Sequence, residues 1–195
     1  NTDRYKSDSN QYPDDPLLPK ELWFTSDPYK RTGYDHGHIC PSADRLNSAE
    51  ANYQTFYITN MQPQVHGFNA GVWQNMENKV REIASRNGYS FCDTLYICKG
   101  GTIDKPEQVL KTVGKGLIVP KYFFMALLRV KNGVYNAMGF WIEHKASDDK
   151  RLAKYAVSIK ELEEKTGIDF FCNLPDNIEN TVENAAVNNT FWGLD

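Results

Sequence analysis

The residues that could perform chemistry lie in two short stretches of the chain. The first, Asp35 to His38, contains two histidines, and the second runs from Asn60 to Glu77. Hydrolysis of a phosphodiester needs a base to make the nucleophile and a cation to take charge from the departing oxygen. His38 as a base and Asn69 as a metal ligand would meet these needs. The two stretches therefore predict a nuclease site with one metal ion.

The prediction for His38 depends on its neighbours. A general base must be largely neutral at the working pH, and the ordinary pKa of histidine is near ~6.5. Gly37 would let a phosphate approach the backbone, and Pro41 would stiffen the following turn. An isolated histidine is more often an ordinary core or surface residue, so His38 is assigned as the base because of the surrounding motif.

The metal ligand is predicted to lie on a helix. Apolar residues recur at spacings of three and four between residues 69 and 87, which predicts an amphipathic helix that ends at Gly88. Asn69 and Glu77 would then share one face. One amide oxygen plus water suits Mg²⁺, with Mn²⁺ and Ca²⁺ as alternatives, and Glu77 would hold one of the waters. The competing interpretations are a helix N-cap for Asn69 and a solvated helix face for Glu77.

A zinc site is the competing metal hypothesis. His36, His38 and Cys40 alternate and would share one face of a strand. Further ligands would come from His66, His144 or another cysteine. However, no second ligand pair has suitable spacing, and the glycine and proline in this stretch disfavour a regular strand. A single hydrated Mg²⁺ fits the residues better.

Composition limits the class of protein. The chain has 195 residues, of which 41% are hydrophobic, so it can bury one sizeable core and is predicted to be a single domain over residues 1–195. The net charge of -3 argues against a protein that coats nucleic acid by bulk electrostatics, so any such contact must be local. No apolar run is long enough to cross a bilayer. There is no basic and apolar leader, which fits either a cytoplasmic protein or a mature or trimmed chain.

The remaining pattern predicts an α+β domain with mixed strands and helices. Residues 1–32 are polar and rich in proline, and they are expected to form an extended segment. A short strand is expected at 56–58, followed by a loop at 63–67. Further elements are predicted at these ranges: strands at 94–98, 116–119, 122–130 and 134–142, with a hairpin turn at Asn132-Gly133, and a second helix at 149–165.

The four cysteines, at positions 40, 92, 98 and 172, include no Cys-x-x-Cys pair. One or two disulfides would fit an oxidising compartment. The apolar run around Cys98 favours a buried free thiol instead.

Three segments together resemble the DNA/RNA non-specific endonucleases of the ββα-metal, or His-Me finger, class. The segments are Asp35-His36-Gly37-His38, then Thr59-Asn60-Met61-Gln62-Pro63-Gln64, then Asn69, Trp73 and Glu77. Residues 155–159 and 166–171 also resemble the family, so the likeness covers most of residues 17–180. The joint occurrence of these motifs makes the resemblance specific.

The resemblance implies a ββα-metal nuclease fold, with a mixed, mainly antiparallel sheet and flanking helices. His38 would be the general base, Asn69 the ligand of a hydrated Mg²⁺, and Glu77 the residue that organises the water of the metal. Asn60 and Gln64 would help to hold the site or the phosphate. The implied reaction is endonucleolytic hydrolysis of DNA and RNA to 5′-phosphate and 3′-hydroxyl ends, with contacts mostly to the sugar-phosphate backbone, which carries no base information.

The sequence departs from the family pattern in two places. His36 stands where the family has an arginine, and neutral imidazole lacks the cationic fork that grips phosphate. Either Arg45 or another cation compensates, or activity is reduced or more acid-dependent. The chain also begins too late to supply the early strands of the family. An alternative function is therefore a weak or inactive nuclease fold that binds nucleic acid or a protein. A monomer or homodimer outside the cytoplasm, secreted or periplasmic, is expected.

Overall fold

A computed structural model of the protein describes residues 12–195, so the first part of the predicted extended segment lies outside the described residues. The strands are β1 (Asp35–His38), β2 (Met61–Gln64), β3 (Thr94–Gly101), β4 (Val109–Val113), β5 (Leu117–Pro120), β6 (Tyr122–Lys131), β7 (Val134–Glu143) and β8 (Ala156–Val157). The α-helices are α1 (Ala49–Gln54), α2 (Gln74–Tyr89), α3 (Ile159–Thr166), α4 (Asp176–Glu183) and α5 (Asn189–Trp192). The shorter turns include η1 (Lys20–Leu22), η2 (Ser42–Asp44), η3 (Ile58–Asn60), η5 (Pro106–Gln108) and η6 (Leu152–Tyr155), and the π-helical turn η4 (Phe68–Trp73) leads into α2.

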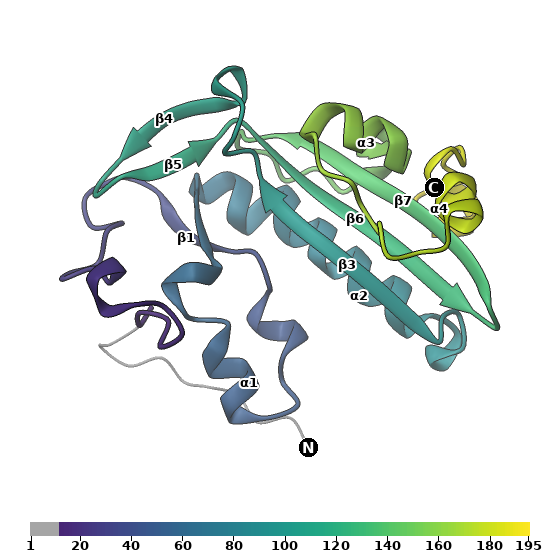
Figure 1. Cartoon of the computed structure of the whole chain (residues 1–195), viewed down its shortest axis with the longest axis horizontal. Coiled ribbons are helices and arrows are strands. Elements are labelled where there is room, and N and C mark those ends of the chain that lie inside the picture. Colours follow the sequence, from purple (N-terminus) through teal and green to yellow (C-terminus); the bar gives the residue numbers. More distant parts are fainter. Residues whose placement is uncertain (1–11) are drawn as a thin grey trace.

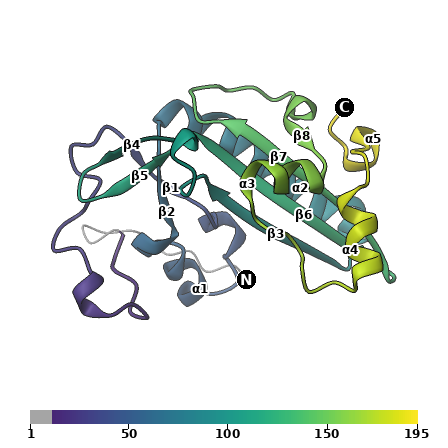
Figure 2. The ribbon, with the colours of Figure 1, turned by 45° about the horizontal axis from the view of Figure 1, so that its top comes forward.

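An antiparallel sheet in the order β3-β6-β7-β8 forms the centre of the molecule. The long helix α2 lies along one face of this sheet, and α3 and α4 cover the other face (Figures 1 and 2). Strands buried on both faces are expected to be apolar throughout, and β6 is buried from Phe123 to Arg129. The fold therefore has three layers.

Alternating side chains of the central strands supply two cores. Phe123, Met125 and Leu127 of β6 face α2, whereas Phe124, Ala126 and Leu128 face α3 and α4. This alternation follows from the period of two along a strand. The helix α2 contributes Met76, Val80 and Ile83 to its core, at the spacing predicted from the sequence. The core is therefore what holds α2 in place beside the sheet.

A separate hairpin of β1 and β2 lies next to the start of this helix (Figure 1). The chain then turns through η4 into α2, so two strands and a helix follow one another in space as a ββα unit. Gly71 marks a kink inside η4, where a side chain would collide with the carbonyl of Ser147. The same carbonyl accepts the N–H of Val72 at 2.6 Å. The loop after β7 thus fixes the start of the helix that carries Asn69.

Most predicted elements of the C-terminal half are confirmed. The strands predicted at 94–98, 116–119, 122–130 and 134–142 correspond to β3, β5, β6 and β7. Asn132 and Gly133 form the predicted hairpin turn with φ of 49° and 74°. The predicted helix at 69–87 is also present, and between residues 12 and 32 the only regular element is the short turn η1.

Three predictions were wrong. The strand expected at 56–58 lies in a turn that includes η3, and the strand is instead β2, whose last two residues fall in the stretch expected to be a loop. Backbone pairing with β1 overrides the local Gln-Pro-Gln composition, because proline is tolerated in a two-stranded edge. The second wrong prediction was that Gly37 and Pro41 disfavour a regular strand here, because Asp35–His38 form β1. The helix expected from 149 begins at Ile159, where Ser158 caps it by accepting the N–H of Glu161.

No helix within residues 12–195 has the length and apolar character needed to cross a membrane.

Candidate active site

The strand β1 presents its residues alternately to two sides. His36 and His38 share one face, while Asp35 and Gly37 share the other. On the second face, the side chain of Gln64 lies so close to Gly37 that a side chain at that position would collide with it. Glycine is therefore required here by close packing.

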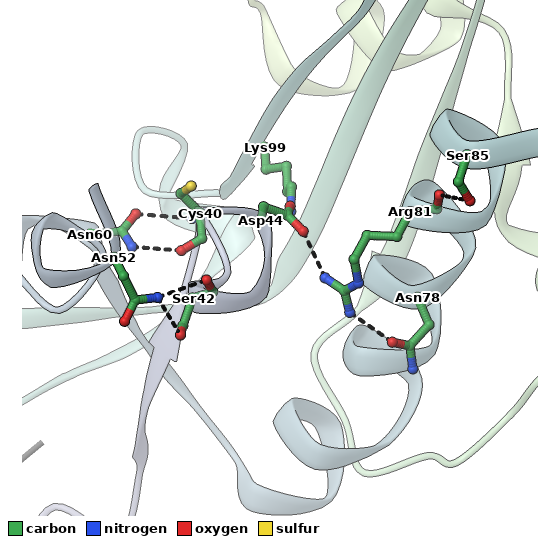
Figure 3. Close-up of polar contacts among 9 residues, drawn as sticks. All are labelled: Cys40, Ser42, Asp44, Asn52, Asn60, Asn78, Arg81, Ser85 and Lys99. Atoms are coloured by element: carbon green, nitrogen blue, oxygen red, sulfur yellow. Dashed lines mark hydrogen bonds and ion pairs between the residues drawn. The ribbon is translucent and has the colours of Figure 1, made fainter. Parts of the chain in front are cut away.

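Asn60 fixes the backbone just after His38. Its Oδ1 accepts the N–H of Cys40 at 2.9 Å, and its Nδ2 donates to the carbonyl of Cys40 at 2.9 Å (Figure 3). Its Nδ2 also donates to the carbonyl of Thr55 at 2.8 Å. These three bonds use both amide hydrogens and one oxygen lone pair. The structure therefore places Asn60, predicted as a catalytic residue, where it braces the end of the strand that carries the candidate base.

The imidazole of His38 lies between aromatic rings. Phe56 and Tyr12 contact it edge-on, with ring centroids 5.2 and 6.5 Å away, and its buried Nε2 has no hydrogen-bond partner among the described residues. Burial, and then the neighbouring His36, lower the pKa of His38 to about 4, against a hydrogen bond with the backbone of His36. Because Nε2 is unpaired, that bond uses Nδ1. The Nε2 lone pair is left to accept a proton.

We expect the His38 ring in the metal-free protein to stay neutral far below the ordinary histidine range. Its folded pKa is below the unfolded value, so the unfolded chain binds the proton more readily. The stability that comes from the neutral ring is complete above the unfolded pKa near ~6.5 and is lost as pH falls toward about 4. The measurement is a titration of the ring nitrogens by ¹⁵N NMR. A His38 midpoint at or above ~6.5, the ordinary value for histidine, would contradict the expected burial effect.

His36, predicted to bind substrate, is held in an aromatic cage. Its ring stacks on Tyr12 with centroids 3.6 Å apart, and Tyr29 lies 4.2 Å away on a tilted plane. Its Nε2 is 2.9 Å from Oδ1 of Asp27. The ring of His36 and its Nε2 are thus already in contact with other residues of the protein. The binding of phosphate by His36 therefore stays a prediction.

Asn69 lies at the start of the helix but is not its N-cap, because the cap position belongs to Gly67. Its Nδ2 donates to Oδ2 of Asp35 at 3.0 Å, and Nδ1 of His66 lies 2.9 Å from the same oxygen. This bond orients the amide so that Oδ1 of Asn69 points away from Asp35. The structure therefore joins Asn69 to β1 through Asp35, a contact that the sequence did not predict.

Glu77 lies two helical turns further along, beyond Trp73. The indole Nε1 of Trp73 donates to the carbonyl of His38 at 3.4 Å and also hydrogen-bonds to Glu77. Burial raises the pKa of Glu77 to about 7, although Lys99 and Arg81 oppose this rise. The turn η4 and the helix that follows it thus run beside β1, and Asn69 and Trp73 bond to that strand.

A cluster of charged side chains, of which Lys99 was missed by sequence reasoning, acts on Glu77. Asp44 accepts a hydrogen bond of 2.8 Å from Arg81, and Lys99 lies 3.8 Å from the other oxygen of Asp44 (Figure 3). Arg81 is four residues after Glu77 on one helix, so the spacing could have identified it. Lys99 comes from β3, and no local pattern connects it with Glu77.

The two other predicted substrate-binding residues differ in exposure. Gln64 is fully buried, and neither its Oε1 nor its Nε2 has a partner among the described residues. Arg45 is exposed at the end of η2, next to Asp44. Only Arg45 is therefore presented at the surface, where a phosphate could reach it.

The described residues do not assemble the zinc site. Within residues 12–195, the only group of carboxylate, imidazole and thiol atoms with metal-like spacing consists of Glu163, Asp169 and Glu183, far along the chain from His38. The proposed additional ligand His144 is engaged at both nitrogens, with the N–H of Val65 at 2.8 Å and the carbonyl of Pro120 at 2.8 Å. The structure thus gives no support to zinc.

All four cysteines are free thiols. Cys98 is exposed, so the prediction that it is buried was wrong. It lies in β3, an edge strand whose outer residues are open to solvent. The apolar composition of this stretch therefore indicated a strand but not its burial.

The donor atoms around Asn69 fit a hard cation better than a soft one. The Asn69 amide has its oxygen turned away from Asp35, and the Glu77 carboxylate in the first turn of α2 also offers oxygen. Mg²⁺ prefers such oxygen ligands and retains much of its water. The residues present therefore fit the predicted ion.

Comparison with known proteins identifies the family. The profile of the DNA/RNA non-specific endonucleases matches residues 1–177. The chain therefore belongs to this family, as the motifs around His38 and Asn69 predicted.

Several relatives carry nuclease names. A nuclease from Nostoc sp. (strain PCC 7120) is 34% identical over 195 residues, which cover 92% of this chain and 65% of that protein. Nuclease 1, mitochondrial, from Schizosaccharomyces pombe is 31% identical, with 84% of this chain and 53% of the relative covered. Endonuclease G, mitochondrial, from Caenorhabditis elegans is 28% identical, with 84% and 55% covered. The chain thus spans between half and two thirds of the length of these relatives.

The fold has a solved counterpart in a crystal structure of the EndoG/EndoGI complex. The TM-score is 0.74 at 22% identity, and the match covers 91% of this chain and 74% of that chain. This likeness confirms the predicted α+β fold of the ββα-metal type. Because named relatives include mitochondrial and cyanobacterial proteins, a location outside the cytoplasm stays a prediction, as does a monomer or homodimer.

Proposed function

We propose that this chain is a metal-dependent endonuclease that hydrolyses the phosphodiester bonds of DNA and RNA. The observation that carries the proposal is the unpaired Nε2 of His38, held on the ββα unit whose helix presents Asn69 and Glu77. A neutral imidazole with a free lone pair is what a general base requires. The family to which the chain belongs supports the substrate class.

Each side chain has a distinct task in this proposal. His38 takes a proton from the attacking water at Nε2, while Asn60 braces the backbone beside it. Asn69 would hold Mg²⁺ through its amide oxygen, and Glu77 would orient water around the ion. When bound, the ion supplies positive charge that stabilises the departing oxygen. Breaking the bond between phosphorus and the 3′ oxygen leaves 5′-phosphate and 3′-hydroxyl ends.

One observation favours the alternative function, a fold that binds nucleic acid or a protein without cleaving it. The rings of Tyr12 and Phe56 lie beside the imidazole of His38, whose Nε2 is buried, and His36 is already engaged by Asp27. A substrate therefore reaches the base only if one of these rings moves. Tyr12 holds φ at 62°, a strained value for a bulky residue, which makes its ring the better candidate.

Incubation with supercoiled plasmid and with folded RNA tests the proposal. We expect both substrates to be cut with Mg²⁺ and to stay intact with EDTA. Fragments that a ligase rejoins without kinase treatment would carry the expected ends. Intact plasmid and RNA across neutral pH, from protein shown to be folded, would reject cleavage and favour the binding function.

A further inference from the structure

Three basic residues line an open pocket of about 310 Å³ that the proposed function does not use. They are Lys30 and Arg31, from the segment that leads into β1, and Lys115, from the turn between β4 and β5. Figure 1 shows this turn beside the segment before β1, at the left of the molecule. We call these three residues the basic pocket. Two segments far apart in the sequence thus bring positive charge to one place.

Close packing holds the turn of Lys115 against the segment before β1. A side chain at Gly114 would lie 2.2 Å from the carbonyl oxygen of Pro28, so only glycine allows this approach. Nζ of Lys115 donates to Oγ1 of Thr25 at 3.0 Å. The place of the cations is therefore set by the backbone as well as by their long side chains.

The cations of the basic pocket have no carboxylate partner. Elsewhere in the described chain, ion pairs with carboxylates are made by Lys79, Arg81, Lys131, Lys145, Lys154 and Lys165. The three cations of the pocket form no such pair within residues 12–195. The whole chain has a net charge of -3. A local group of unpaired cations therefore runs against the overall composition and calls for an anionic ligand.

Asp27 also lines the pocket, but it is committed to other partners. Its Oδ1 lies 2.9 Å from Nε2 of His36 and accepts the N–H of Tyr29 at 2.9 Å. One carboxylate cannot balance three cations, so the pocket keeps an excess of positive charge. Because Asp27 contacts His36, the pocket adjoins the face of β1 that His36 shares with His38.

Arg31 has an unfavourable backbone conformation. Its φ is 63°, a region that residues other than glycine rarely adopt. Strain of this kind is found mainly at functional sites, where the surrounding structure retains it. The guanidinium also presents a fixed fork of donors that matches the oxygens of a phosphate. A glycine at this position would relieve the strain but would remove the group that suits phosphate.

We propose that the basic pocket binds the phosphate backbone of the nucleic acid, beside the phosphodiester that is cleaved at His38. This inference rests on the proposed function and gives its substrate a second point of contact. Phosphate contacts supply most of the affinity for nucleic acid that does not depend on sequence, and in a chain with net negative charge they must be local. DNA and RNA share these phosphates, which carry no base information. The pocket thus contributes affinity and takes no part in breaking the bond.

The first test measures binding without cleavage. In a His38→Ala background with EDTA, fluorescence anisotropy gives Kd for a labelled DNA duplex and a labelled RNA hairpin across a series of salt concentrations. We expect Lys30→Gln combined with Lys115→Gln to raise Kd by at least about fivefold at low salt. The slope of log affinity against log salt should become shallower by about two, roughly one for each lost phosphate contact. Duplexes of different sequence should lose the same affinity.

Lys131→Gln combined with Lys160→Gln is the matched control. It removes the same charge from the end of β6 and from α3, away from the pocket. We expect its Kd to change by less than about twofold, because solvent and salt screen distant exposed charges. Lys30 and Lys115 are exposed, so thermal unfolding should show an intact fold in the pocket variant. A pocket variant with the Kd and salt slope of this control would overturn the proposal.

Arg31 is tested by itself with two replacements. Arg31→Gly removes the cation but relieves the strained φ, so it should weaken binding while Tm is kept or raised. Arg31→Lys keeps the charge and should bind more tightly than Arg31→Gly. Equal binding by wild type and a folded Arg31→Gly would exclude Arg31 from the phosphate site.

Plasmid cleavage separates this inference from the proposed function. With Mg²⁺, the variant of Lys30 and Lys115 should show a higher KM and an unchanged kcat, because the pocket binds substrate and transition state equally. If wild type cleaves nothing but the pocket variant binds more weakly, hydrolysis is rejected and the phosphate site stands. If wild type cleaves and both Kd and KM are unchanged in the variant, the phosphate site alone is rejected. Wild type that binds neither duplex nor hairpin would reject both.

Discussion

Replacing His38 with alanine is expected to lower the rate of plasmid cleavage by about 10²- to 10⁴-fold, the usual contribution of a positioned general base. The variant loses the buried, unpaired Nε2 of His38, which no other imidazole within residues 12–195 matches. Its fold should persist, because the backbone beside His38 is braced by Asn60 rather than by the ring. Initial rates at saturating Mg²⁺, together with thermal unfolding, would measure both effects.

His66→Ala is the matched control for this experiment. The His66 side chain is 81% exposed, and its recorded polar contact is with Asp35, which keeps its bond to Asn69 when the ring is removed. We expect its rate to fall by less than about tenfold, in line with a peripheral contact. A His38→Ala variant that cleaves as well as His66→Ala would show that another group acts as the base.

Sequence reasoning located the helix of the site because its apolar residues recur with the helical period. Met76, Val80 and Ile83 are fully or almost fully buried in the core, so local pattern and tertiary packing agree. Asn69 and Glu77 both lie on this stretch, but the kink at Gly71 separates them, so the helical period alone does not fix their relative orientation. The strands β6 and β7 could be predicted equally well, since their apolar runs and the Asn-Gly turn are strong local signals.

The hairpin of β1 and β2 was harder to predict. Its strands contain Gly37 and Pro63, which locally disfavour strand structure. They pair across residues 39–60, so no short turn motif signals the pairing. The same holds for Asp35, whose contacts with His66 and Asn69 cross the hairpin and the helix start. Such contacts depend on tertiary packing and leave no periodic signal.

The charged cluster around Glu77 shows most clearly which features of the site cannot be predicted from local sequence patterns. Arg81 could be inferred from helical spacing, but Lys99 lies on a strand that looks like an ordinary apolar run. Its burial depends on how β3 packs against η2 and α2. The sequence therefore predicts the presence of the carboxylate but not the groups that set its charge.

Replacing Asn69 with alanine is expected to raise the Mg²⁺ concentration needed for half-maximal cleavage by more than about tenfold. The change removes the amide oxygen that would hold the ion and also the donor to Asp35. With fewer protein ligands, Mg²⁺ would be retained mainly by its own water, so cleavage at limiting metal should fall further than cleavage at saturation. Cleavage measured across a Mg²⁺ series gives both quantities.

Thermal unfolding with and without Mg²⁺ separates a loss of metal binding from a loss of stability. A ligand that binds only the folded protein raises Tm, so Mg²⁺ should stabilise wild type and have little effect on Asn69→Ala. Asn75→Ala is the matched control, since Asn75 lies on the same helix but donates to the carbonyls of Asp148 and Asp149. It should lower Tm without changing the Mg²⁺ response. An Asn69→Ala variant with unchanged Mg²⁺ dependence would mean that the ion is held elsewhere, with the carboxylates of Asp35 and Glu77 as the next ligands to test.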